Sequence, residues 1–98
     1  MSDRGVIEAA WLHLTRAELP ALAAARGWPV HADHCFQRIL LDNAFGGRWY
    51  DHVAGRPAYA HVPADALARA IELGRAAIAG EADMTALNRA SLAWRRRG

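Results

Sequence analysis

The fold of this chain is decided by its central stretch DHCFQRILLDNAF, residues 33–45, which ends at a pair of glycines. On a helical wheel of about 100° per residue, one arc of this stretch is apolar and the opposite side carries a polar strip flanked by two more apolar residues. The arc holds Cys35, Phe36, Ile39 and Leu40, and the opposite side holds His34, Arg38, Leu41, Asp42 and Phe45. A helix that is apolar on two sides is typical of a bundle centre or of an interface. We therefore expect a central helix from about Asp33, as its N-cap, to Phe45.

Apolar spacing and capping signals predict further helices on both sides of the central one. A first helix is expected at residues 7–14. A capping box at residues 15–18 predicts a second helix that starts there and runs to residue 26. The alternative is one kinked helix over residues 7–26. Pro63, at the first helical position, begins a helix that Gly80 ends. A last helix begins near Asp83, and residues 47–62 form an irregular connection in which a short ribbon at residues 49–59 is the alternative.

These elements predict an all-α protein, a compact bundle of four to five helices that forms one domain over residues 1–98. Its length suits a single domain, and a hydrophobic share of 53% with 22% charged residues excludes a disordered chain. The expected core residues are Phe36, Ile39, Leu40, Leu67, Ile71, Ile78 and Leu87.

The composition also predicts the cellular location of the chain and the classes of partner that it does not bind. Charges interrupt every apolar stretch well short of the ~20 residues that span a bilayer, so we expect no membrane partner. The single cysteine excludes an intramolecular disulfide and suits a reducing cytoplasm. All twelve basic residues are Arg, yet the net charge is only +2, and without Arg95, Arg96 and Arg97 the rest is near neutral. This tail could contact phosphates, but without a recognition helix nucleic acid is the less favoured partner.

The polar strip of the central helix has two interpretations. In the first, it is a stacked polar face on which Arg38 and Asp42 pair at i, i+4. In the second, it receives a ligand or a partner together with the aromatic residues of the connection. The candidate binding residues are then His34, Arg38, Leu41, Asp42, Phe45, Arg48, Trp49, Tyr50 and His52.

No catalytic or metal motif is complete in this sequence. His31, His34, Cys35 and His52 are the available metal ligands, but no Cys-x-x-Cys or second ligand pair accompanies them, so we expect neither a metal nor another cofactor. Cys35 beside His34 is the candidate nucleophile, because a helix start lowers a thiol pKa. A lone Cys is more often a small buried hydrophobe, and no phosphate-binding glycine loop or acyl-transfer triad is visible.

The segments that contain most of the candidate site residues also resemble those of a known family. The segment HCFQRI at residues 34–39, then LDN at residues 41–43, Gly46, Trp49, LNR at residues 87–89 and SLAWR at residues 91–95 resemble a family of short bacterial proteins, over nearly the whole chain. Many of these proteins are labelled N-acetyltransferase-like, which implies acyl transfer. That acetyltransferase fold needs a mixed sheet and a pyrophosphate-binding turn, which a chain this short and helical does not predict.

Our leading prediction is a small, non-catalytic helical binding module whose partner is a protein or a second copy of the chain. The alternative is a small-ligand or acyltransferase-related site around His34, Cys35, Arg38 and Asp42. The second alternative is nucleic-acid binding by the tail at residues 95–97. An exposed apolar patch at residues 41, 45 and 49 would favour a protein partner, whereas a buried pocket at residues 34, 38 and 50 would favour a small ligand.

Overall fold

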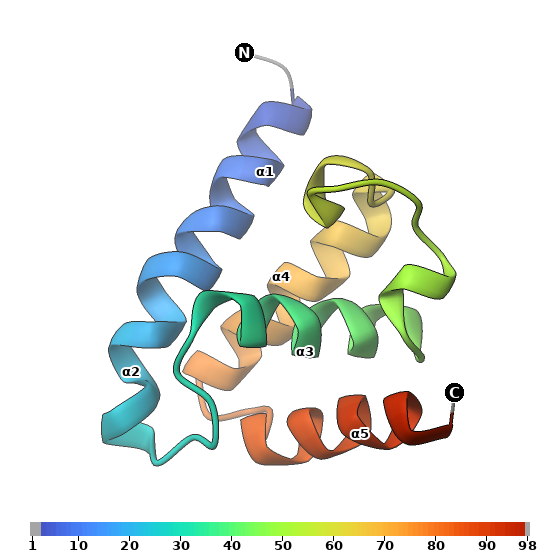
Figure 1. The fold of residues 1–98 in the computed structure, drawn as a ribbon. Coiled ribbons are helices and arrows are strands. Elements are labelled where there is room, and N and C mark those ends of the chain that lie inside the picture. Colours follow the sequence, from blue (N-terminus) through green and yellow to red (C-terminus); the bar gives the residue numbers. More distant parts are fainter. Residues whose placement is uncertain (1–2, 98) are drawn as a thin grey trace.

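Helix α3 (Asp33–Phe45) lies at the centre of the fold and contacts both α4 (Ala64–Ile78) and α5 (Met84–Arg97) (Figure 1). The structure is a computed structural model that describes residues 3–97, apart from the side chain of Arg97. Within this range the chain forms helices and turns and no strand, so the prediction of an all-α bundle of four to five helices is confirmed. No helix of the described part is long and apolar enough to cross a lipid bilayer.

The N-terminal part is one continuous helical rod, as in the second predicted alternative of a single kinked helix, but it begins at Asp3 rather than at residue 7. It consists of α1 (Asp3–His13), a π-helical turn (Leu14–Glu18) and α2 (Leu19–Arg26) (Figure 1). Across the π turn the N–H of Leu19 donates to the carbonyl of Leu14, five residues earlier. The ring of Pro20 would clash with the carbonyl four residues earlier in a regular α-helix, and the wider turn just before it accommodates the ring.

The interface between α3 and α4 is apolar and close. The buried residues that α4 contributes are Ala66, Leu67, Ala70, Ile71, Gly74 and Ala77. Gly74 allows the close approach, because a Cβ there would lie 2.6 Å from Cδ2 of Leu14 and 3.1 Å from Cδ1 of Leu40. Of the predicted core, Phe36, Ile39, Leu40, Leu67 and Ile71 are buried, whereas Ile78 and Leu87 are half-buried and pack against the core.

Two predicted helix starts are shifted by one residue. Asp33 is the first residue of α3 rather than its N-cap, and its carboxylate accepts a hydrogen bond from the N–H of His34 at 2.7 Å. Pro63 is the cap of α4 in extended backbone, rather than its first helical residue. Both side chains still suit the start of a helix, since the carboxylate satisfies one free N–H and proline needs none.

The connection between α3 and α4 covers the second apolar side of α3. It contains two 3₁₀ turns, Trp49–Asp51 and Ala58–Ala60, where the alternative of a short ribbon is wrong. Leu41 is only 2% exposed, and the half-buried Phe45 stacks on His52 with ring centroids 4.9 Å apart. The chain itself therefore covers most of the side of α3 that faces away from the main core.

Candidate functional site

A fully buried carboxylate joins α3 to α5. Oδ1 of Asp42 accepts from the backbone N–H of Trp49 at 3.0 Å, and Oδ2 accepts from the hydroxyl of Ser91 at 2.6 Å. Arg95 donates from Nε to Oδ2 at 2.9 Å and from Nη2 to Oδ1 at 3.3 Å. Both oxygens are thus bonded, and the guanidinium of Arg95 compensates the buried charge.

Arg38 lies one turn before Asp42 on α3, but the predicted pair of Arg38 with Asp42 is wrong. Its Nη1 donates to the hydroxyl of Ser91 at 2.7 Å, and its Nη2 donates to the amide oxygen of Asn88 at 2.8 Å. Asp42 forms its ion pair with Arg95 instead, because α5 brings a guanidinium and a hydroxyl against it in a buried interface. The partners of Arg38 are neutral, so its positive charge has no ion pair within the described residues.

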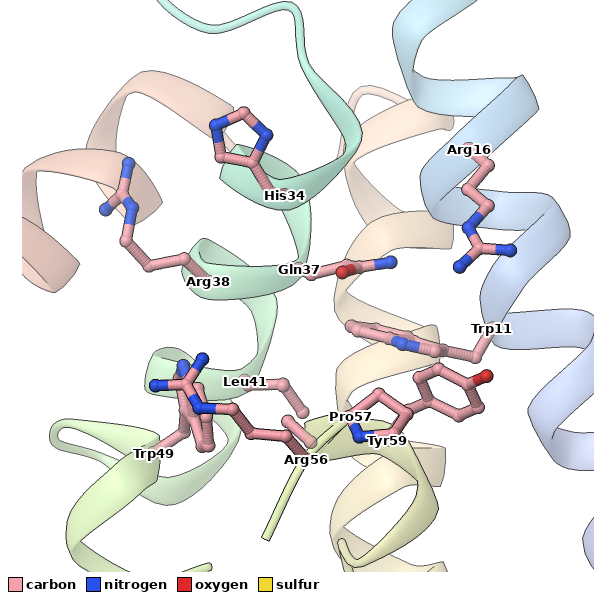
Figure 2. A pocket seen from close by; sticks show the side chains of 11 residues that line it. Trp11, Arg16, His34, Gln37, Arg38, Leu41, Trp49, Arg56, Pro57 and Tyr59 are labelled. Carbon is pink, nitrogen blue, oxygen red and sulfur yellow. The ribbon is translucent and has the colours of Figure 1, made fainter.

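A pocket of about 270 Å³ opens between α1, α3 and the connection that follows α3 (Figure 2). Its floor is largely apolar and aromatic, with Trp11, Leu41, Trp49, Pro57, Ala58 and Tyr59. Its polar lining is Gln37 with four basic side chains, Arg16, His34, Arg38 and Arg56. No acidic residue belongs to this lining.

The walls of the pocket are held by hydrogen bonds from three elements. Arg4 of α1 donates from Nη2 to the carbonyl of Tyr59 at 2.6 Å, which fixes the second 3₁₀ turn against α1. The buried carboxylate of α3 fixes the backbone of Trp49 in the same way. On the π turn, the hydroxyl of Thr15 donates to the carbonyl of Trp11 at 2.9 Å and accepts from Nε2 of Gln37 at 3.1 Å. Thr15 therefore orients a wall of the pocket and is not the N-cap of the predicted capping box.

The basic residues of the pocket are only weakly neutralised. Nε of Arg16 lies 3.9 Å from Oδ2 of Asp33, and both side chains are about half exposed. Nδ1 of His34 lies 3.6 Å from Oδ1 of the same carboxylate. The guanidinium of Arg56 lies 5.9 Å from the ring centroid of Trp49, a cation–π contact without a carboxylate. A single half-exposed carboxylate, that of Asp33, thus lies near a rim with several basic side chains.

A second basic cluster lies outside the pocket, around the exposed ring of Tyr50. The guanidinium carbons of Arg48 and Arg95 lie 5.5 Å and 5.2 Å from its ring centroid. Arg48 also donates to Asp51 at 2.8 Å, and this hydrogen bond raises the pKa of the guanidinium above its ordinary value. Each of these arginines has a carboxylate partner, so this cluster is closer to neutral than the pocket.

The structure brings together four of the nine predicted binding residues. His34, Arg38, Leu41 and Trp49 line the pocket. The other five lie elsewhere: Asp42 in the network beneath it, Phe45 and His52 in a stack, and Arg48 and Tyr50 in the exposed cluster. The predicted nucleophile Cys35 is half-buried, and it is not part of the lining.

The sequence did not indicate the part of the pocket that other segments supply, nor Gln37 on α3 itself. Trp11, Arg16, Gln37, Arg56 and Tyr59 were not among the candidates, although all line it. The aromatic content of the connection was a partial signal. No signal in the sequence could pair Gln37 with the π turn, because that contact joins residues far apart in the chain.

The chain offers no ready metal centre. The described residues contain no group of three or more His, Cys, Asp or Glu side chains that could hold a metal ion. Whether the purified protein is free of zinc stays a prediction, which elemental analysis can check.

Comparison of the chain with protein-family models, with curated proteins and with solved structures found no match. The resemblance to short bacterial proteins labelled N-acetyltransferase-like therefore stays an expectation.

Proposed function

We propose that this chain is a non-catalytic helical binding domain, and that its pocket between α1, α3 and the connection takes a small anionic molecule. The observation that carries the proposal is the lining itself, which has four basic side chains and no acidic one. A concave surface with charges of one sign attracts and concentrates ligands of the opposite sign. Guanidinium groups in particular bind carboxylates and phosphates through paired hydrogen bonds.

The interactions that each arginine of the pocket already makes support this proposal. Arg38 is bonded to neutral acceptors, and Arg56 lies over the ring of Trp49 and has no carboxylate partner among the described residues. Arg16 lies at the edge of salt-bridge distance from Asp33. A ligand anion would therefore gain charge-assisted hydrogen bonds without having to displace a strong ion pair.

The size of the pocket supports a small molecule rather than a folded partner. Its volume of about 270 Å³ lies just below the roughly 300–1,000 Å³ that is typical of small-molecule sites. The surface offers less to a protein partner, because the exposed large apolar side chains of the described residues are spread over three elements as Val6, Tyr50 and Leu92. Of the residues that first favoured self-association, Leu41 is buried and Phe45 is half-buried with its ring stacked on His52 of the connection.

We propose a non-catalytic role because no nucleophile and base face each other across this pocket. Cys35 is not part of the lining, and the imidazole of His34 is 80% exposed beside Asp33. Nucleophilic catalysis requires the two groups within hydrogen-bond reach. Acyl transfer, the activity implied by the resemblance, has no further support from the arrangement of these residues.

The arrangement of the basic residues in the C-terminal tail also favours the pocket, rather than the tail, as the binding site. Arg95 is turned inward onto Asp42 and is only 28% exposed in its side chain. The predicted phosphate-binding tail therefore has one cation fewer, and the side chain of Arg97 lies outside the described residues. We expect no tight binding to duplex DNA at physiological salt.

The proposal is tested by calorimetric titration with a panel of small organic carboxylates and phosphates, each paired with an uncharged analogue. We expect saturable binding of at least one anion, weakened about tenfold or more by Arg56→Gln, since a charge-assisted hydrogen bond is worth roughly 1.5–3 kcal/mol. The matched control is Arg89→Gln, which removes the same charge from an exposed position of α5. Equal weakening by both variants, or no saturable anion binding at all, would overturn the proposal.

A further inference from the structure

Two exposed arginines of the pocket lie on its opposite sides. Arg16 belongs to the π turn of the N-terminal helical rod, whereas Arg56 belongs to the connection that follows α3. Figure 2 shows the guanidinium of Arg16 on the side of the rod and that of Arg56 across the pocket, beside Trp49. One small anionic group therefore meets one of these guanidinium groups and not both.

Neither of these two arginines is held by a strong ion pair. Nε of Arg16 lies 3.9 Å from Oδ2 of Asp33, and the two side chains are 56% and 48% exposed. An ion pair this long and this exposed to water contributes little stability. Arg56 lies over the ring of Trp49 and has no carboxylate partner among the described residues. Each guanidinium can thus accept a carboxylate at little cost to the protein.

The third arginine of the lining, Arg38, has a different role. Its two terminal nitrogens donate to Ser91 and Asn88 of α5, at 2.7 Å and 2.8 Å. Figure 2 shows its side chain extending toward α5 and away from Arg16. Its charge therefore adds to the positive potential on the side of Arg56, and Arg16 remains the separate cation of the opposite side.

The lining between the two sides is uncharged. Figure 2 shows Leu41 and Pro57 between the guanidinium groups of Arg16 and Arg56, with the ring of Tyr59 next to Pro57. Pro57 is exposed and Tyr59 is half-buried, so both offer apolar surface that a ligand can cover. A ligand that fits this arrangement carries its charges at its two ends and an apolar part between them.

We infer that the pocket selects a dicarboxylate whose two carboxylates are separated by an apolar spacer. One carboxylate pairs with Arg16, the other pairs with Arg56, and the spacer packs over Pro57 and Tyr59. A carboxylate suits the Arg16 side better than a phosphate monoester, because a phosphate carries about −1.5 to −2 charge at pH 7 and a single guanidinium balances only part of it. This inference rests on the proposed function, since it names the class of anion that the pocket binds.

The first experiment measures what the second carboxylate adds to binding. Linear dicarboxylates from succinate to sebacate are each compared with their own monomethyl ester, which keeps the spacer and one carboxylate. By calorimetry, we expect the best diacid to bind about threefold to tenfold more tightly than its ester, between the effects of an exposed ion pair and of a charge-assisted hydrogen bond. This gain should be greatest at one spacer length, because a shorter diacid does not span both arginines and a longer one loses more conformational freedom.

Two variants then assign the gain to the two sides of the pocket. Arg16→Gln and Arg56→Gln each leave one of the two arginines, so in each variant the best diacid should bind within about twofold of its ester. Arg69→Gln is the matched control, because Arg69 is an exposed arginine outside the pocket with its own weak carboxylate partner, Asp65 at 3.4 Å. This control should keep the full gain, which excludes a general effect of net charge. Circular dichroism checks that all three variants are folded.

The outcomes distinguish this inference from the proposed function. Equal binding of every diacid and its ester by the unmodified chain would overturn the inference and leave anion binding standing. A gain that survives in folded Arg16→Gln, or that is lost equally in Arg69→Gln, would also overturn it, because the second carboxylate would then not lie at Arg16. Absence of binding by every carboxylate and phosphate would overturn the proposed function itself.

Discussion

Helix α3 is packed by different means on its two sides. Toward α4 the contact is apolar, with Leu40 seated where Gly74 has no side chain. Toward α5 the contact is a hydrogen-bonded network, in which Asp42 and Arg38 share the hydroxyl of Ser91. One helix thus combines an interface that depends on shape with one that depends on matched donors and acceptors.

The difference teaches what each interface does for the pocket. An apolar interface supplies stability and tolerates alternative side-chain packings of similar volume. A buried polar network is satisfied in few arrangements, so it fixes the position of the groups that it holds. The polar side of α3 is the side that carries the pocket, because Asp42 also holds the backbone of Trp49 and Arg38 also lines the cavity.

The largest effect should come from the apolar side. Leu40→Ala removes a fully buried side chain and should lower the free energy of unfolding by about 2–5 kcal/mol. Leu92→Ala, at an exposed position of α5, should cost well below 1 kcal/mol. Denaturant titration of both variants measures this, and similar small losses would contradict the burial of Leu40.

The second largest loss of stability should come from a substitution that disrupts the polar interface without changing its shape. Asp42→Asn removes the charge that faces Arg95 and turns one acceptor into a donor, so we expect a loss of about 1–3 kcal/mol in unfolding free energy. Asp51→Asn, whose ion pair with Arg48 is partly exposed at the surface, should cost less than about 1 kcal/mol. If the two variants lose equal stability, the network does not differ from a surface ion pair.

The sequence predicted these two interfaces unequally. The spacing of Leu67 and Ile71 along α4 is enough to place an apolar stripe, because burial repeats with the helical period. The polar interface depends on which residues of α5 lie opposite Asp42, and these are about 50 positions away. Local spacing therefore favoured Arg38 as the partner of Asp42, when the distant Arg95 takes that place.

The pocket was predictable in part for the same reason. Five of its lining residues lie on or shortly after α3, and four of them were identified, all but Gln37. Its remaining walls come from α1, from the π turn and from the second 3₁₀ turn. The π turn itself was not predicted, because the sequence signals at Thr15 and Pro20 are those of an ordinary helix start.

A smaller effect tests how tightly the apolar interface is closed. Gly74→Ala places a methyl group 2.6 Å from Cδ2 of Leu14, which overpacks the core by about 1–3 kcal/mol. Alanine recovers about 1 kcal/mol through its better helix propensity, so we expect a net loss of about 0–2 kcal/mol. A double-mutant cycle with Leu14→Ala sharpens this, since the methyl should become favourable once Leu14 is shortened. Independent effects of the two changes would contradict the close contact.

The smallest effect on stability should come with the largest effect on binding, at Arg38. Its guanidinium bonds to two neutral acceptors at a half-buried position, so Arg38→Ala should lower the free energy of unfolding by only about 0.5–1.5 kcal/mol. The same change removes a charge from the pocket lining and leaves the floor beside Leu41 open to water. Affinity for the best anion of the panel should therefore fall by about tenfold or more. Phe45→Ala is the matched control, because Phe45 stacks on His52 outside the pocket and should change stability while leaving affinity intact. Denaturant titration and calorimetry on the two variants measure both quantities. If Arg38→Ala lowers stability and leaves anion affinity at its original value, the polar side of α3 serves only to dock α5, and the pocket loses its role.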